Sequence, residues 1–482
     1  MSQHDDVLSM EEAIERLKTT RPTFYRWLRA GRIKGHKVGR QWRFYAADLE
    51  RFLQGESPRI DLPVGVGPLL STLAVKLADV LPAGGKVPEV SETAAGLWER
   101  ILLLGIALKA EHLHLENLFI EGESQAVLRC RIDGVLQCLA QFDHRLLNPL
   151  IEVVRQQATC APTHSELLQH GQLVYVSPLQ TASRYEVRLQ FLKTYSGPAL
   201  NVQILNTQVQ ERIRLAQIDL PEPIHDQVLR VLDQGWGLVV ASGPSGSGKT
   251  TTLYAAMNQI ARAERKCFNL QSAPDANLPW VSTLKVNDAP IDVLKALMDS
   301  DLDALLMEAP EDPATLQYAL RIVLSGHLVM TTMQSQDAVQ ALRQLRDLSG
   351  NAYSVSEALH LLLNQRLVRR LCSHCREQVD LPEDWRLALS ELLPKHHLQM
   401  PTGKVWQAKG CGHCHQGYRG RLQLTEILQF TPDLRQAFLQ GEPASVLRER
   451  WFAAGAKSWV ADGLARAESG LTSLAEILRA AG

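Results

Sequence analysis

A glycine-rich stretch near the middle of the chain has the residue types that could hold a polyphosphate. Residues 236–242 form a short apolar run that predicts a buried parallel strand, and residues 251–260 predict a helix. Between them, the sequence GPSGSGKT (243–250) has the glycine, lysine and hydroxyl spacing of a phosphate-binding loop. The backbone N–H groups of such a loop close around a β-phosphate at the positively polarised start of the helix.

The side chains that end this loop predict ATP and Mg²⁺ as ligands. Lys249 is expected to reach the β- and γ-phosphates, and the Thr250 hydroxyl is expected to hold Mg²⁺. A vestigial loop that binds nothing is the alternative. The candidate nucleotide-binding residues are Gly243, Pro244, Ser245, Gly246, Ser247, Gly248, Lys249, Thr250 and Thr251.

Two Cys-x-x-Cys pairs indicate a metal site nearer the C-terminus. They are Cys372 with Cys375 and Cys411 with Cys414. Four thiolates at this spacing can bind Zn²⁺ in a closed tetrahedral site, which leaves no position for water and is therefore structural. The intervening residues 380–398 have a helical pattern, so we expect the site at the base of an inserted hairpin. Four free thiols are the alternative.

Length and composition indicate an ordinary globular protein of several domains. A chain of 482 residues is too long for one core. Its net charge is −1, so any basic binding site must be local. No apolar run reaches the ~18–20 residues that span a bilayer, and residues 1–6 do not have the character of a signal peptide. We therefore expect a cytoplasmic protein.

The first 53 residues predict a small basic module of two helices, a hairpin and a third helix. Ten lysines and arginines and no acid lie between Arg16 and Arg43, as on a nucleic-acid-binding face. The segments LSMEEA (8–13), TFYRWL (23–28) and KVGRQWRF (37–44) resemble the excisionase-type winged helix-turn-helix.

This resemblance implies that the second helix enters a DNA major groove and that the wing meets the DNA backbone. A basic face that is merely solvated, or that meets an acidic protein, is the alternative. The residues implied to contact double-stranded DNA are Thr23, Tyr25, Arg26, Arg29, Arg40 and Arg43.

Six further segments, from about residue 90 onward, occur in the order of one ATPase family. They are AEHLHLE (110–116), RCRIDGVL (129–136), TTTLYAA (250–256), LSGHLV (324–329), QRLVRRLC (365–372) and GYRGR (417–421). By these segments the chain resembles the ATPases of type II secretion and type IV pilus assembly. The resemblance implies a hexameric ring, either homomeric or shared with other secretion ATPase subunits, that docks peripherally on inner-membrane platform proteins.

Together the motifs and resemblances predict an α/β multidomain protein. The expected parts are an excisionase-like winged helix-turn-helix (1–53), a linker (54–86), a PAS-like second N-terminal domain of secretion ATPases (87–215), a RecA-like P-loop core (216–365), a tetracysteine zinc unit (366–430) and a C-terminal helical region (431–482).

Several positions that carry the family's chemistry hold other residue types here. The family's acidic box aligns with LQSAP (270–274), which lacks a carboxylate. The Walker B glutamate aligns with Ala309, and Glu308 lies one residue early. If the strand predicted at 304–307 continues through Glu308, its side chain points to the opposite face. Gln334 stands where the family has a histidine, although a glutamine orients water in some nucleotide hydrolases.

These departures affect hydrolysis more than nucleotide binding. Two arginines that the family extends to a neighbouring subunit's phosphates appear as Ala199 and Gln203, and losing one such arginine typically costs ~10³–10⁵ in rate. Glu308 and Gln334 remain the candidate catalytic residues. Three functions stay open: a secretion or pilus motor ATPase, a nucleotide-binding pseudo-ATPase that scaffolds a ring, and an ATP-gated DNA-binding regulator.

Overall fold

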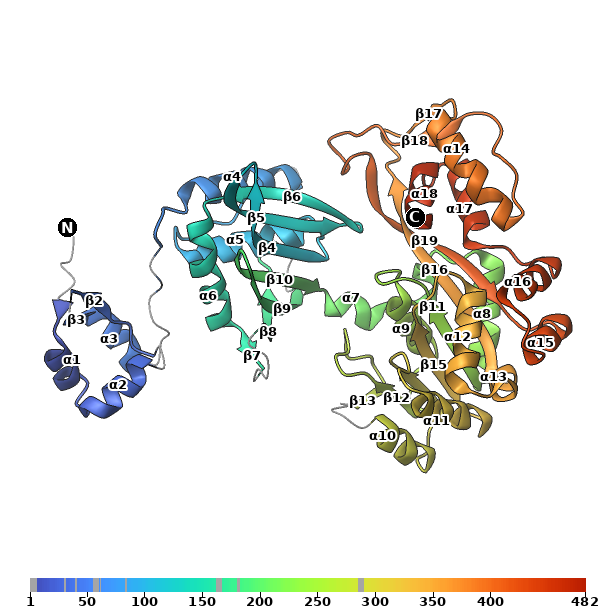
Figure 1. Cartoon of the computed structure of the whole chain (residues 1–482), viewed down its shortest axis with the longest axis horizontal. Helices are drawn as coiled ribbons and strands as arrows, with labels where there is room; N and C mark the ends of the chain where they lie inside the picture. The colour runs from blue at the N-terminus through green and yellow to red at the C-terminus, as the bar shows by residue number, and fades with distance from the viewer. Residues whose placement is uncertain are drawn as a thin grey trace. The chain divides into compact units, whose positions relative to one another are not determined.

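The computed structural model describes residues 7–29, 32–39, 41–54, 60, 62–82, 85–161, 167–179, 183–284 and 290–482. The chain divides into two compact units, which are described separately (Figure 1). The N-terminal unit comprises Met1–Ile132 and Leu136–Leu205, and the C-terminal unit comprises Asp133–Val135 and Asn206–Gly482. A helix long and apolar enough to cross a membrane does not occur in the described ranges.

The N-terminal unit begins with a small module whose elements follow the predicted order. After β1 (Val7–Leu8) come α1 (Met10–Arg16), α2 (Arg21–Arg29), the hairpin of β2 (His36–Val38) and β3 (Gln41–Tyr45), and α3 (Ala46–Leu53). Helix α1 starts with a capping box, in which Ser9 Oγ accepts the N–H of Glu12 and Glu12 accepts the N–H of Ser9. The rings of Phe24 and Phe44 meet edge to face in the core of this module.

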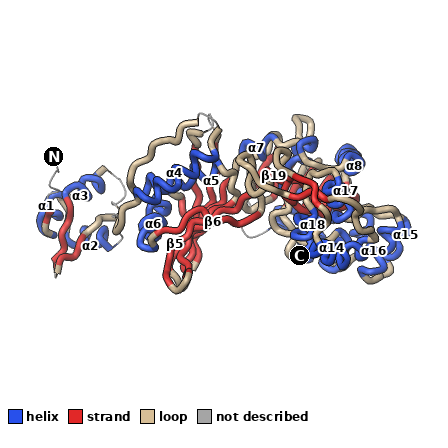
Figure 2. Tube along the Cα trace, turned by 90° about the horizontal axis from the view of Figure 1, so that it is seen from above, coloured by secondary structure: helices blue, strands red, loops and turns tan. Residues whose placement is uncertain are grey.

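The rest of the N-terminal unit is a seven-stranded antiparallel sheet with helices packed against it (Figure 2). The strand order is β6-β5-β4-β10-β9-β8-β7. The strands are β4 (His112–Ile120), β5 (Glu123–Ile132), β6 (Val135–Phe142), β7 (Thr159–Cys160), β8 (Leu168–Val176), β9 (Arg184–Thr194) and β10 (Gly197–Leu205). They share one apolar core with α4 (Gly67–Val80), α5 (Ala94–Ala107) and α6 (Leu147–Gln157). Helix α4, which lies within the segment expected as a linker, therefore forms part of this core.

The C-terminal unit is built on a second seven-stranded sheet, in the order β13-β12-β14-β15-β11-β16-β19. Its strands are β11 (Gly237–Ser242), β12 (Cys267–Leu270), β13 (Val281–Leu284), β14 (Ala304–Met307), β15 (Leu328–Met333), β16 (Leu359–Leu371) and β19 (Tyr418–Leu428). All neighbours are parallel except β16 and β19. The central strands are apolar runs because helices cover both faces, as is usual for parallel sheets.

Helices connect and cover the strands of this sheet. They are α7 (Thr207–Arg212), α8 (Glu222–Gln234), α9 (Lys249–Ile260), α10 (Pro290–Met298), α11 (Pro313–Leu324), α12 (Ala338–Ser349) and α13 (Ala352–Ala358). An insert between β16 and β19 contains β17 (Glu377–Val379), α14 (Glu383–Leu392) and β18 (Val405–Gln407), and β17 pairs with β18. The chain then continues through α15 (Pro432–Leu439), α16 (Ala444–Ala453), α17 (Trp459–Glu468) and α18 (Leu474–Ala481).

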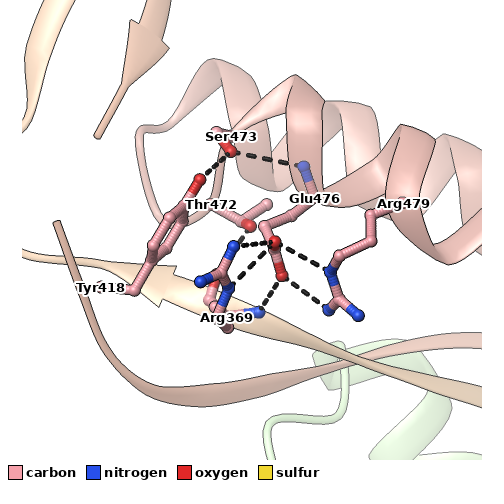
Figure 3. Close-up of polar contacts among 6 residues, drawn as sticks. All are labelled: Arg369, Tyr418, Thr472, Ser473, Glu476 and Arg479. Carbon is pink, nitrogen blue, oxygen red and sulfur yellow. Dashed lines mark hydrogen bonds and ion pairs between the residues drawn. The ribbon is translucent and has the colours of Figure 1, made fainter. Parts of the chain in front are cut away.

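A buried carboxylate joins α18 to β16 (Figure 3). Glu476, whose side chain is 1% exposed, accepts hydrogen bonds from the backbone N–H of Arg369 (2.8 Å) and from Nη2 of both Arg369 and Arg479 (2.7 Å each). Beside it, the hydroxyls of Tyr418 and Ser473 lie 2.8 Å apart. Burial alone would raise the pKa of Glu476, but the hydrogen bonds from Arg479 and Arg369 outweigh burial and lower that pKa.

Replacing Glu476 by glutamine is expected to lower the free energy of unfolding of the C-terminal unit by about 3–5 kcal/mol, because the Arg369 guanidinium loses its buried counter-charge. Asp292→Asn is the matched control, since the Asp292–Lys295 pair is exposed and such pairs contribute about 0–1 kcal/mol. Urea unfolding followed by tryptophan fluorescence measures both variants. Equal, small effects from the two substitutions would contradict a stabilising role for the contact between Glu476 and Arg369.

The same contact has a defined pH dependence. The folded-state pKa of Glu476 is lowered. The stabilisation that the ionised Glu476 gives the folded protein is therefore complete above its unfolded-state pKa of about 4.3. It is lost as the pH falls through the lower, folded-state value. The stability difference between the wild-type protein and Glu476→Gln is therefore expected to shrink in acid.

Candidate functional site

The glycine-rich loop lies where the sequence predicts it, between the end of β11 and the start of α9. Helix α9 begins at Lys249, two residues earlier than expected, so Thr250 and Thr251 lie in its first turn. Gly243 has φ of 140° and Gly248 has φ of 87°, conformations that favour glycine. A Cβ atom on Gly243 would also lie 2.3 Å from the carbonyl oxygen of Gln365. The nine expected nucleotide-binding residues (243–251) thus form one continuous segment, which comprises the loop and the first turn of α9.

The ammonium group of Lys249 rests on the carbonyl groups of its own loop. Its Nζ donates to the carbonyl oxygens of Gly243 (3.0 Å) and Pro244 (2.7 Å). Burial lowers the pKa of Lys249. A phosphate in the loop would offer this cation a charged acceptor in place of two neutral ones, which makes a stronger hydrogen bond.

Strand β16 supports the loop with two buried amide side chains that the sequence interpretation missed. Gln365 Nε2 donates to the carbonyl oxygen of Ser247 (3.0 Å), and Asn364 Nδ2 donates to Ser242 Oγ (3.0 Å). Both amides are completely buried. The available sequence signal was a pair of amides within the otherwise leucine-rich run LLLNQRLV (361–368), which is unusual for a buried strand.

Glu308 lies outside the strand that precedes it. Strand β14 ends at Met307, so the expectation that a continued strand would turn Glu308 to the opposite face does not apply. The Glu308 carboxylate accepts hydrogen bonds from the backbone N–H (2.7 Å) and the hydroxyl (3.0 Å) of Ser272, in the loop after β12. The neighbouring Ala309 offers no carboxylate. The acid nearest the Walker B position is therefore directed towards Ser272.

The second candidate catalytic residue, Gln334, directly follows β15 and is exposed. Strands β11, β14 and β15 are parallel neighbours in the same sheet, so Gln334, Glu308 and the phosphate loop all follow strand ends at one edge. The loop after β12 is joined to α9 as well, because Tyr254 donates its hydroxyl to Gln271 Oε1 (2.7 Å). Burial raises the pKa of Tyr254 to about 12, so it remains a donor.

The four cysteines of the two Cys-x-x-Cys pairs come together between the end of β16 and the start of β19. Their sulfur atoms all lie within 4.8 Å of one another. The separations are 3.9 Å for Cys372 and Cys411, 3.7 Å for Cys375 and Cys414, and 3.6 Å for Cys411 and Cys414. Tetrahedral zinc with Zn–S bonds of about 2.3 Å requires S···S edges of about 3.8 Å. The cluster therefore has the donors and dimensions of a four-thiolate metal site.

Five of the six expected DNA-contacting residues lie on α2 and β3. Tyr25, Arg26 and Arg29 are exposed on α2. Thr23 is half-buried and accepts a hydrogen bond from Thr20, and Arg43 on β3 donates to Gln41 (2.7 Å). Arg40 lies outside the described residues.

Comparison with known sequences matches both parts of the chain. A family model described as "Type II/IV secretion system protein" matches residues 94–479, and one described as "Helix-turn-helix domain" matches residues 7–57. The chain is 30% identical to "Type II secretion system protein HxcR" of Pseudomonas aeruginosa, over 77% of this chain and 74% of that protein. It is 29% identical to "Type II secretion system ATPase E" of Vibrio cholerae, over 84% and 78%.

A solved structure has a similar fold. The ATPase DotB of Legionella pneumophila superposes with a TM-score of 0.55 at 16% identity, over 79% of this chain and 93% of that one. The family model extends over well more than half of the residues. The chain therefore belongs to the type II/IV secretion system protein family, with a helix-turn-helix domain at its N-terminus.

Proposed function

We propose that this protein binds MgATP in the loop at 243–251 and acts as a ring subunit of a type II secretion or type IV pilus-like system, with weak hydrolysis of its own. In this proposal the C-terminal sheet is a RecA-like core and the antiparallel sheet of the N-terminal unit is a PAS-like domain. The ring is a hexamer, homomeric or shared with active secretion ATPase subunits, at the cytoplasmic face of the inner membrane. Relatives named as type II secretion ATPases support this assignment.

The contrast between the phosphate loop and the Walker B region carries the proposal. The loop has every glycine and hydroxyl that binding needs, and Lys249 makes only exchangeable contacts with loop carbonyls. By contrast, Ala309 replaces the expected base, and the nearest carboxylate, on Glu308, is engaged by Ser272. Catalysis of phosphoryl transfer depends on positioned charge, so binding is retained while turnover is reduced.

The cysteine cluster is proposed to hold one structural zinc ion. The donor set is four thiols, and none of the four cysteines is in a disulfide. A closed four-thiolate site contributes its binding free energy to folding. Here it would join the end of β16 to the start of β19 and thereby stabilise the insert between them.

A second proposed function is binding of double-stranded DNA by the N-terminal module. Arg26 and Arg29 are exposed on α2, the helix that such modules insert in the major groove. The basic stretch from Arg16 to Arg43 contains no acid, and its ion pairs with Glu50 and Glu11 engage Arg16 and Arg21 and leave Arg26 and Arg29 exposed. Through this module, ATP-dependent ring assembly could gate a DNA contact.

The nucleotide proposal predicts opposite effects of two substitutions. Lys249→Ala is expected to abolish MgATP binding, because the loop loses its only lysine. Ala309→Glu is expected to raise the slow steady-state hydrolysis rate by about 10²-fold, the usual effect of a positioned general base. Ala309→Gln is the matched control, with a similar side chain but no carboxylate. Calorimetric titration measures binding, and phosphate release measures turnover.

Fast turnover by the unmodified protein would refute weak hydrolysis. If Glu308→Gln then abolished that turnover, Glu308 would be the base after rotating away from Ser272. A protein that binds neither ATP nor ADP would refute the proposal as a whole.

For zinc, elemental analysis of the purified protein is expected to find about one ion per chain. Cys411→Ser is expected to lose this ion and to lower the melting temperature of the C-terminal unit, because three thiolates no longer close the site. Cys138→Ser serves as the control, since Cys138 is an exposed thiol of the N-terminal unit. A metal-free protein with an unchanged melting temperature would rule the site out.

DNA binding is tested with a duplex of mixed sequence at low salt. The double variant Arg26→Ala/Arg29→Ala is expected to weaken binding and to reduce the slope of log K against log[salt] by about 0.9 for each DNA phosphate that the protein no longer neutralises. The control is Arg262→Ala/Arg386→Ala, which removes the same charge from exposed sites of the C-terminal unit. If both double variants bind alike, or if the wild-type protein does not bind, this function is discarded.

A further inference from the structure

Strand β16 carries three consecutive buried polar side chains opposite the end of β11. Ser242, the last residue of β11, pairs in register with Asn364, and Gln365 and Arg366 follow. Asn364 and Gln365 are completely buried and Arg366 is nearly so. Because successive side chains of a strand alternate between faces, Asn364 and Arg366 share one face and Gln365 points to the other.

Gln365 serves the phosphate loop. Its side-chain amide donates to the carbonyl oxygen of Ser247 (3.0 Å). Separately, the backbone carbonyl oxygen of Gln365 lies so close to Gly243 that a Cβ atom there would collide with it. This part of the loop encloses the α- and β-phosphates, which ADP and ATP have in common.

Asn364 connects the base of the phosphate loop to the loop that follows β15. Its Nδ2 donates to Ser242 Oγ (3.0 Å) and to Ser335 Oγ (3.0 Å). Ser335 is itself buried and directly follows the exposed Gln334. One amide group thus joins the end of β11, where the phosphate loop begins, to the loop that follows β15.

Arg366 fixes the next residue of the same loop. Its Nη2 donates to the carbonyl oxygen (2.9 Å) and to Oε1 (2.7 Å) of Gln336. The guanidinium also lies over the ring of Trp459, 5.1 Å from its centroid. The chain on the C-terminal side of Gln334 is therefore anchored at two successive residues, while Gln334 itself remains exposed.

We propose that Asn364 is a positioning residue that keeps Gln334 directed at the γ-phosphate and so allows the site to distinguish ATP from ADP. Asn364 acts through Ser335, whereas Gln365 supports the part of the loop that both nucleotides occupy. This inference rests on the proposed nucleotide binding and extends it to the choice between the two nucleotides. It assigns different roles to two adjacent, equally buried amides.

The test compares Asn364→Leu with Gln365→Leu in the full-length protein. Dissociation constants are measured by titration calorimetry for ADP and for a non-hydrolysable ATP analogue, each with excess Mg²⁺. Asn364→Leu is expected to lower the preference for the ATP analogue over ADP about tenfold, because the hydrogen bond to Ser335 in the Gln334 loop is removed. The loss of its hydrogen bond to Ser242, at the base of the phosphate loop, is expected to weaken both ligands alike and so not to change that preference. Gln365→Leu is expected to weaken both ligands by the same factor.

A third variant, Ser335→Ala, removes one of the two hydrogen bonds without altering β16. It is expected to shift the preference in the same direction by a similar factor, and it replaces Asn364→Leu if that variant does not fold. Melting temperatures check folding in each case. The inference is overturned if the substitutions at Asn364 and Ser335 weaken both ligands equally or change neither. If the wild-type protein binds neither ligand, the proposed nucleotide binding fails first, and this inference fails with it.

Discussion

Polar side chains buried along β16 make hydrogen bonds inside an otherwise apolar sheet, and these bonds connect the strand to several parts of the C-terminal unit. The side-chain nitrogen of Gln365 donates to the phosphate loop, and that of Asn364 donates to the end of β11 and to the loop after β15. The side-chain oxygens of both amides are buried without a hydrogen-bond partner among the described residues. Arg369, further along the strand, is satisfied by Glu476 of the last helix. The strand then ends next to Cys372, the first residue of the cysteine cluster. One thirteen-residue strand thus contacts the candidate nucleotide site, the C-terminal helix and the candidate metal site.

At this edge of the sheet, the groups proposed to bind the nucleotide and those proposed to hydrolyse it are positioned in different ways. Binding groups are backbone amides and a lysine of a single continuous segment, which local glycine conformations suffice to arrange. Chemical groups come from different strand ends, and their directions depend on contacts with neighbouring loops, as the Ser272–Glu308 contact illustrates. A sequence can therefore lose its catalytic groups by substitutions that leave its nucleotide-binding groups intact.

The sequence was informative where function follows from local spacing. The phosphate loop, the cysteine cluster and the strand Ala304–Met307 occur as predicted, because each depends on adjacent residues or on a short repeated spacing. It was uninformative where a contact joins distant segments. Gln365 and Ser247 are 118 positions apart, and Ser272 and Glu308 are 36 apart, so neither pairing follows from periodicity. The segment that contains α4 was assigned to a linker because glycines and prolines border it, although its apolar stretch at 66–81 indicated a helix that packs on a neighbour, as α4 does.

The contact between Glu476 and Arg369 also has a consequence for biosynthesis. The two residues are 107 positions apart, so Arg369 leaves the ribosome several seconds before its partner, at a synthesis rate of about 5–20 residues per second. Strand β16 cannot bury that guanidinium against its counter-charge in the interval. The N-terminal unit can complete its own sheet by then, since its strands end at Leu205. Newly made chains therefore pass through a stage in which all strands of the N-terminal sheet are available to fold while the C-terminal unit still lacks the partner of Arg369.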